Sequence, residues 1–243
     1  REKDLGIWQT WTWQELAEQA EQLAAGLAGL GVKDGQHVAV IGENRPRLYL
    51  AMMAAQMLGA VPVPLYQDAV AQEMLHVLLD ASIRVAVVED QEQVDKLLEV
   101  WDQCPDLDAL IYDDPRGLRN YQQEQLQYIE QVMEQGRLQL ARDPDCVRRI
   151  WKAITPDHAA AMFYTSGTTG KPKGVVLTHG ALVDRGLAIQ ELESLTDAEE
   201  VLAYLPPAWI GQNMFSYTQF LVTGFTVNHP ESPETVSIDL HDI

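Results

Sequence analysis

Between residues 12 and 112 the chain alternates short apolar runs with longer segments of helical periodicity, and this alternation limits the folds open to it. Residues 38–41, 85–88 and 109–112 are apolar runs short enough to be buried strands. Buried strands that alternate with helices favour a parallel sheet covered on both faces. We therefore predict an α/β fold with a mainly parallel β-sheet and helices on both faces.

Several residues mark where the intervening helices begin. Thr12 and Glu15 have the spacing of a capping box at the start of the first helix. Asn44 is expected to cap a second helix that ends near Leu58. Residues 61–64 alternate Val and Pro, which suits a strand at the edge of the sheet or a strand end. Further helices are expected at about residues 70–80 and 91–103.

Residues 113–155 interrupt the alternation with a stretch rich in Gln, Glu, Asp and Arg. The spacing of Leu126, Ile129, Val132 and Met133 predicts one surface helix there. We interpret this stretch as a polar helical excursion within one domain.

A Gly-rich string follows the apolar run at residues 159–164, which reads as another buried strand. It covers residues 165–174 and combines glycines, which let the backbone approach a ligand closely, with hydroxyl and ammonium groups. These donors suit a polyphosphate. Thr165 and Pro172 exclude a Walker A loop, which requires Gly and a hydroxyl residue at those two places. A solvated turn between two strands is the alternative interpretation.

The string from Tyr164 to Gly174, Y-T-S-G-T-T-G-K-P-K-G, resembles the phosphate-binding signature of AMP-forming adenylating enzymes. That family includes acyl-CoA synthetases, luciferases and the adenylation domains of peptide synthetases. Segments 12–16, 59–66 and 203–209 are similar to other family segments and occur in the same order. Within the family, segments near residues 112–118 and 230–234 are most similar to bacterial long-chain acyl-CoA synthetases.

The resemblance implies ATP-dependent activation of a long-chain fatty acid to an acyl-adenylate, followed by transfer to CoA. It implies ATP, Mg2+ and CoA as cofactor and co-substrates. Residues 1–243 would form the first part of the large N-terminal, AMP-binding domain of such an enzyme. The catalytic Lys and the small C-terminal domain are expected beyond residue 243, and so are the metal-binding residues. The chain alone is therefore expected to be inactive.

The resemblance also assigns site residues. Trp209 occupies the place of an aromatic residue or His that borders the acyl site. Lys171 is as easily a solvated loop residue as a ligand contact. The expected nucleotide-binding residues are Thr165, Ser166, Gly167, Thr168, Thr169, Gly170, Lys171 and Lys173.

The net charge of −19, from 36 acidic and 17 basic residues, excludes nucleic acid as a partner. No apolar stretch reaches the roughly 20 residues of a membrane span. The two cysteines, Cys104 and Cys146, lack metal-site spacing and suit a reducing compartment. We expect a cytoplasmic protein, with contact at the membrane surface left open. Because an incomplete sheet exposes an edge, self-association of the chain is also expected.

Three alternatives remain open from the sequence. The substrate of the same chemistry could be an aryl or medium-chain acid, or the acceptor could be a carrier protein. A second alternative is a non-catalytic nucleotide-binding module. The third is an α/β scaffold that binds no ligand.

Overall fold

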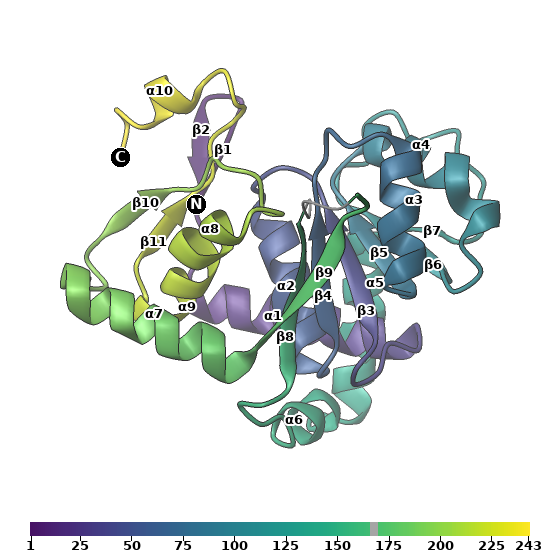
Figure 1. The fold of residues 1–243 in the computed structure, drawn as a ribbon, viewed down its shortest axis with the longest axis horizontal. Coiled ribbons are helices and arrows are strands. Elements are labelled where there is room, and N and C mark those ends of the chain that lie inside the picture. The colour runs from purple at the N-terminus through teal and green to yellow at the C-terminus, as the bar shows by residue number, and fades with distance from the viewer. Residues whose placement is uncertain (166–169) are drawn as a thin grey trace.

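The computed structural model describes residues 1–165 and 170–243. At its centre lies a five-stranded parallel sheet with strand order β4-β3-β5-β6-β7 (Figure 1). The predicted parallel sheet is therefore confirmed, and β4, the strand with two prolines, lies at an edge of this sheet. The strands are β3 (His37–Ile41), β4 (Val61–Leu65), β5 (Ile83–Val88), β6 (Ala109–Tyr112) and β7 (Leu126–Tyr128).

Helices cover both faces of this sheet, as the alternation predicts. One face packs on α1 (Trp13–Gly29), α2 (Pro46–Met57) and α5 (Ile129–Arg142), and the other on α3 (Ala71–Asp80) and α4 (Gln91–Val100). Successive strand residues serve opposite faces: Val38 and Val40 join the first core, whereas Ala39 and Ile41 join the second. All four are essentially inaccessible to solvent, which explains the unbroken apolar run.

The helix-start signals give one confirmation and one error. The capping box predicted at the start of α1 is present, with Thr12 and Glu15 each bonded to the other's backbone amide. Asn44 does not cap α2. That helix begins after Arg45, with Pro46 in its first turn and no side-chain cap. The side chain of Asn44 instead bonds to residues far along the chain.

Residues 113–155 pack more closely against the central sheet than their polarity predicts. Leu126 lies in β7, the fifth strand, and not in the predicted surface helix. α5 follows at once and buries Ile129 and Val132 against the sheet and α1. The contact with α1 is very close, because a Cβ on Gly136 would lie 1.8 Å from the carbonyl oxygen of Gln22. A three-residue strand directly joined to a helix leaves too short a pattern to read from sequence. A further short helix, α6 (Cys146–Trp151), ends this stretch.

The remaining elements lie beside the central sheet (Figure 1). β8 (Ala159–Thr165) and β9 (Lys173–Thr178) form an antiparallel hairpin, and α7 (His179–Glu193) follows with Thr178 as its cap, as predicted. β10 (Glu200–Leu202) pairs with β11 (Thr226–Asn228). Between them run α8 (Ile210–Gln212), a π-helical segment (Asn213–Thr218) and α9 (Gln219–Thr223). β1 (Glu2–Asp4), β2 (Ile7–Gln9) and α10 (Val236–Asp239) lie near one another.

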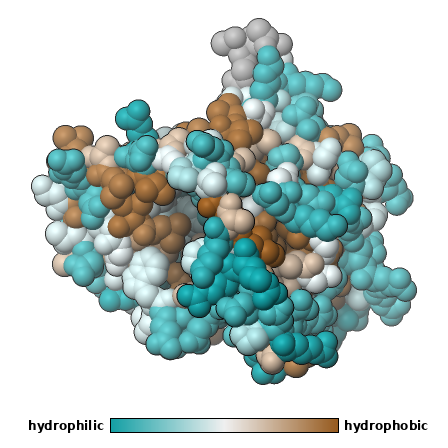
Figure 2. Space-filling view, turned by 90° about the horizontal axis from the view of Figure 1, so that it is seen from below, coloured by the Kyte–Doolittle hydropathy of each residue, from teal (hydrophilic) through white to brown (hydrophobic). Residues whose placement is uncertain are grey.

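Apolar side chains remain exposed on β9 and α7. Val175 and Val176 are each about half exposed, as are Val183 and Leu187, while Leu192 is 79% exposed. Figure 2 shows hydrophobic patches on the lower face of the molecule, separated by hydrophilic regions. Within the described residues, no helix combines the length and the apolar character needed to cross a membrane. Self-association stays a prediction.

Candidate functional site

The Gly-rich string connects the two strands of the β8–β9 hairpin. Thr165 at the end of β8 pairs in register with Lys173 at the start of β9, and Tyr164 pairs with Gly174. The loop thus joins strand to strand, whereas a Walker A loop joins a strand to a helix. Gly170 has φ +129°, a backbone conformation that other residues rarely adopt. Of the predicted nucleotide-binding residues, Ser166, Gly167, Thr168 and Thr169 lie outside the described residues.

A pocket of about 760 Å³ opens beside this hairpin. Three of the predicted site residues line it: Thr165, Lys171 and Trp209. Trp209 is 42% exposed, so part of its ring system is available to a ligand. Gly170 and Lys173 are not among the lining residues. Most of the remaining wall is apolar and includes Leu65, Tyr66, Met74, Val77, Phe163 and Tyr164.

Helix α3 holds both ends of the loop. The hydroxyl of Tyr164, just before the loop, donates to Oδ2 of Asp80 at 2.7 Å. Nε2 of His76 lies 2.9 Å from the carbonyl oxygen of Pro172, just after the loop, and donates to it. Burial and the bond to Asp80 raise the pKa of Tyr164, so its hydroxyl stays a donor. We call these two contacts, Tyr164 with Asp80 and His76 with Pro172, the clamp. It was not predicted from the sequence, although His76 and Asp80 share one helix face at spacing i, i+4.

Gly174 makes room for the Tyr164 side chain on the paired strand. A Cβ at Gly174 would lie 2.7 Å from Sδ of Met162 and 3.2 Å from Cζ of Tyr164. The last glycine of the string therefore has a packing role that its sequence position alone does not reveal. It lets the Tyr164 ring lie where its hydroxyl reaches Asp80.

Tyr164→Phe tests the clamp, because it removes one hydroxyl and keeps the ring. If the loop binds ATP, as the resemblance implies, we expect the KM for ATP of the protein that carries this chain to rise by about three- to tenfold, since a hydrogen bond to a charged group is lost next to the loop. Tyr121→Phe is a matched control: the hydroxyl of Tyr121 also donates to a carboxylate, that of Asp95, at 2.5 Å but away from the pocket. Steady-state kinetics that give the same KM shift in both variants would contradict the clamp.

The aromatic residues after Trp209 pack in the interior more than they line the pocket. Tyr217 is buried, and its hydroxyl donates to Oε1 of Gln56 at 2.6 Å. Phe220 stacks on Trp13 with ring centroids 4.2 Å apart. Phe215 is 54% exposed. Tyr217 is therefore a core residue, whereas Phe220 is only partly buried and packs against α1 through Trp13.

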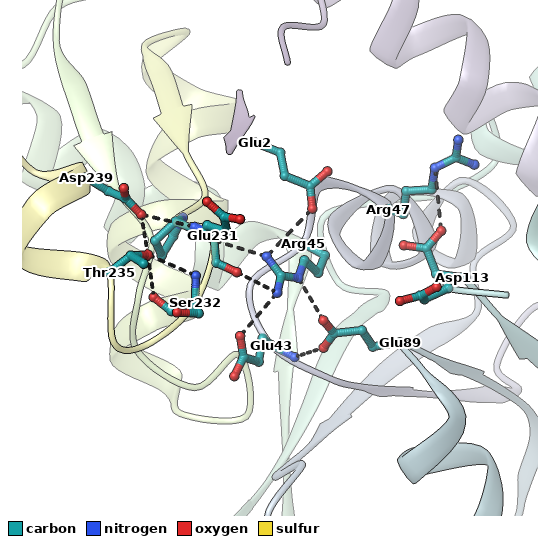
Figure 3. Close-up of polar contacts among 12 residues, drawn as sticks. Glu2, Glu43, Arg45, Arg47, Glu89, Asp113, Glu231, Ser232, Thr235 and Asp239 are labelled. Carbon is teal, nitrogen blue, oxygen red and sulfur yellow. Dashed lines mark hydrogen bonds and ion pairs between the residues drawn. The ribbon is translucent and has the colours of Figure 1, made fainter. Parts of the chain in front are cut away.

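A cluster of charged side chains gathers at the carboxyl ends of the central strands (Figure 3). Arg45 lies at its centre and donates from Nε to Oε1 of Glu89 at 2.7 Å. Its two terminal nitrogens donate to the carbonyl oxygens of Pro230 and Glu231, at 3.0 and 3.2 Å. One guanidinium group thus ties the loop after β3, the end of β5 and the segment before α10 together. Arg45 was not predicted from the sequence, because its partners are up to 186 positions away.

Asp113 belongs to the same cluster and has an unusual protonation equilibrium. Burial raises its pKa to about 7, while Arg47, with Nε 3.6 Å from Oδ1, acts in the opposite direction. The neighbouring carboxylates of Glu2, Glu89 and Asp114 raise the pKa further. The folded protein therefore keeps a proton on Asp113 at pH values where the unfolded chain has lost it.

This pKa shift predicts a pH-dependent loss of stability. As the pH rises from about 4 to about 7, the wild type should lose up to about 1.4 kcal/mol per pH unit relative to Asp113→Asn, because the folded state binds the extra proton. Urea unfolding of both proteins at about pH 5 and pH 8 measures the difference. Other carboxyl groups titrate in both proteins and cancel. A difference that stays constant between pH 5 and pH 8 would mean that Arg47 outweighs burial, because Asp113 would then be ionised in both states over this range.

The described residues contain no group of three or more His, Cys, Asp or Glu side chains placed to hold a metal ion. That the metal-binding residues lie beyond residue 243 stays a prediction.

Comparison with known proteins places these features in a family. Residues 3–242 match the family model described as AMP-binding enzyme. The chain is 31% identical over 221 residues to the long-chain-fatty-acid–CoA ligase ACSBG2 of Xenopus laevis, an alignment that covers 85% of this chain and 28% of that protein. It is 28% identical over 226 residues to the long-chain-fatty-acid–CoA ligase FadD15 of Mycobacterium bovis, covering 91% and 36%.

A solved structure supports the same fold. The apo structure of MbtA from Mycobacterium smegmatis matches with a TM-score of 0.81 and 25% identity, covering 100% of this chain and 43% of that one. The chain spans only 28% and 36% of the two ligases named above. The family model nevertheless matches almost every residue, and the resemblance inferred from residues 164–174 is confirmed. The chain belongs to the AMP-binding enzyme family.

Proposed function

We propose that the protein carrying this chain activates a long-chain fatty acid with ATP and transfers the acyl group to CoA. Residues 1–243 would then be part of its AMP-binding domain. The observation that carries the proposal is the shared pocket: Thr165 and Lys171, at the two ends of the loop, line one largely apolar cavity together with Trp209. The names of the two ligases above support the same substrate class.

The chemistry has two half-reactions. A carboxylate oxygen attacks the α-phosphorus of ATP, pyrophosphate leaves, and an acyl-adenylate forms. The thiol of CoA then attacks the acyl carbon, loses its proton, and displaces AMP. Negative charge develops on the departing pyrophosphate during the first half-reaction, so donors fixed in advance against its oxygens lower the barrier.

The residues of the string divide this work by position. Backbone amides and hydroxyls of residues 166–169 are proposed to bind the β- and γ-phosphates, with Thr165 near the α-phosphate. Lys173, fixed at the start of β9 opposite Thr165, supplies positive charge to the same phosphates. Trp209 borders the acyl chain with its exposed ring surface. Mg2+ would screen phosphate charge when bound, and the catalytic Lys is proposed to lie outside this chain.

Carboxylate-dependent ATP–pyrophosphate exchange by the full-length protein tests the proposal. Acetate, octanoate, palmitate, benzoate and a mixture of amino acids would be compared. Exchange with palmitate, followed by AMP release when CoA is added, is the expected result. Exchange only with benzoate, octanoate or an amino acid would overturn the substrate class but keep the adenylation chemistry. Nucleotide binding without exchange for any acid would favour a non-catalytic module.

A further inference from the structure

The segment that carries Trp209 contains two consecutive residues without a backbone donor. Pro206 and Pro207 lack N–H groups, so two consecutive residues offer the surrounding structure only carbonyl oxygens. The carbonyl oxygen just before them, that of Leu205, accepts a hydrogen bond from Nδ2 of Asn44. This bond joins the loop between β3 and α2 to a segment 161 positions away. It is a long-range anchor immediately before the two prolines.

The amide of Asn44 is itself held in one orientation. Its Oδ1 accepts from the hydroxyl of Tyr49 at 2.9 Å and from Nε2 of Gln212 at 3.2 Å. Gln212 also donates to Oγ of Ser216 at 2.8 Å. Asn44, Gln212 and Ser216 are each no more than 5% exposed. Because donors face Oδ1 on one side and a carbonyl faces Nδ2 on the other, the amide has one favourable orientation.

The same network reaches Trp209 from its other side. Trp209 immediately precedes α8, and its carbonyl oxygen accepts from the backbone amide of Asn213, at 3.2 Å. Gln212 stands just before the π-helical segment, a helix form often found at functional sites. Trp209 therefore lies between two points that Asn44 contacts, Leu205 and Gln212. The next residue, Arg45, donates hydrogen bonds to Glu89 and to the carbonyl oxygens of Pro230 and Glu231. These bonds hold the chain in place next to Asn44.

We infer that Asn44 is a positioning residue for the acyl pocket: it holds Leu205 and Gln212 and thereby sets where the indole of Trp209 stands beside the loop. Asn44 does not line the pocket and acts only through this segment. The inference deepens the proposed function and rests on it. It also explains why Asn44, at a position where a helix cap is expected, leaves α2 without a side-chain cap.

Asn44→Asp is the sharpest test, because it keeps the shape and the acceptor but removes the donor to Leu205. In the full-length protein, we expect the KM for palmitate to rise about tenfold while the KM for ATP changes less than about twofold. Amide hydrogen exchange at Trp209 and Asn213 should become about tenfold faster, a readout that does not depend on activity. Val132→Ala, in the core between α5 and α1, is the control for a general loss of stability. This control should leave both KM values and the hydrogen-exchange rates at Trp209 and Asn213 nearly unchanged.

The outcomes separate the two proposals. If the wild type shows no ATP–pyrophosphate exchange with any acid, the proposed function fails. The hydrogen-exchange result still tests whether Asn44 holds the segment at Leu205. Faster hydrogen exchange in Asn44→Asp without a change in the KM for palmitate would overturn the role of Asn44 at the pocket. Unchanged hydrogen exchange would show that the bond from Asn44 to Leu205 does not hold the segment in place. Should Asn44→Asp fail to fold, Tyr49→Phe removes one of the two donors that orient the Asn44 amide. It should give the same acid-specific shift at about two- to threefold, and an equal shift in both KM values would count against the inference.

Discussion

Lys173→Gln is expected to lower the rate of palmitate-dependent ATP–pyrophosphate exchange by about 100-fold, because one fixed donor is removed from the developing charge on pyrophosphate. The start of β9 fixes the backbone of Lys173 opposite Thr165. Its side chain is exposed, so the substitution removes no core packing and the free energy of unfolding should change by less than about 0.5 kcal/mol. A loss of exchange with unchanged stability would identify a ligand contact.

Lys171→Gln is the matched control, with the same change of charge two residues away. Lys171 lines the apolar pocket at the far end of the loop, and we expect less than a fivefold loss of exchange. Comparing the two variants at low and at physiological salt separates direct contact from a general positive field, because the field is screened and the contact is not. Equal losses that disappear together with added salt would rule out a specific role for Lys173.

Gly136→Ala should destabilise the protein by about 3 kcal/mol, because the added methyl group overpacks the contact between α5 and α1. The added Cβ would meet backbone atoms of α1, at 1.8 Å from the oxygen of Gln22 and 2.7 Å from the nitrogen of Gly26. Backbone cannot rotate away as a side chain can, so α1 and α5 must separate. Urea unfolding followed by circular dichroism measures the change.

Gly29→Ala, in α1, is the control, and we expect it not to destabilise the protein. Gly29 is the last residue of α1, and a Cβ there would meet nothing within 4 Å. The substitution should leave stability unchanged or raise it by up to about 1 kcal/mol, because Ala loses less conformational entropy on folding than Gly. If both variants lost stability equally, the close approach of α1 and α5 would not be the cause.

The central fold was predictable because its signals are local. Val38 to Ile41 are apolar without interruption since β3 is buried on both faces, and Thr12 and Glu15 satisfy each other's backbone amides within one turn. Asn44 misled the prediction for a physical reason. A residue with the right chemistry for a cap found stronger partners in Leu205 and Tyr49, which no local pattern reveals.

The sequence predicted which residue types form the candidate site, but it did not predict the residues that hold them in place. The string of Gly, Thr and Lys has a specific order, so Thr165 and Lys171 could be named, and Trp209 was named from the similar segment 203–209. The structure places these three around one pocket. The residues that hold them could not be named. His76 and Asp80 reach the hairpin across 96 and 84 positions, and such pairs are visible only once the chain has folded.

The bonds that join β1 to α10 have a consequence for the order of folding. Nζ of Lys3 donates to Oδ1 of Asp239 at 2.8 Å, across 236 positions, whereas the strands of the central sheet are joined by short βα connections. Closing so long a loop costs entropy before any contact is gained. The ion pair should therefore form after the rate-limiting step, so that Lys3→Met accelerates unfolding and leaves the refolding rate nearly unchanged. The contact between the two ends of the described chain therefore forms late in folding. It determines the unfolding rate of the native state more than the folding rate.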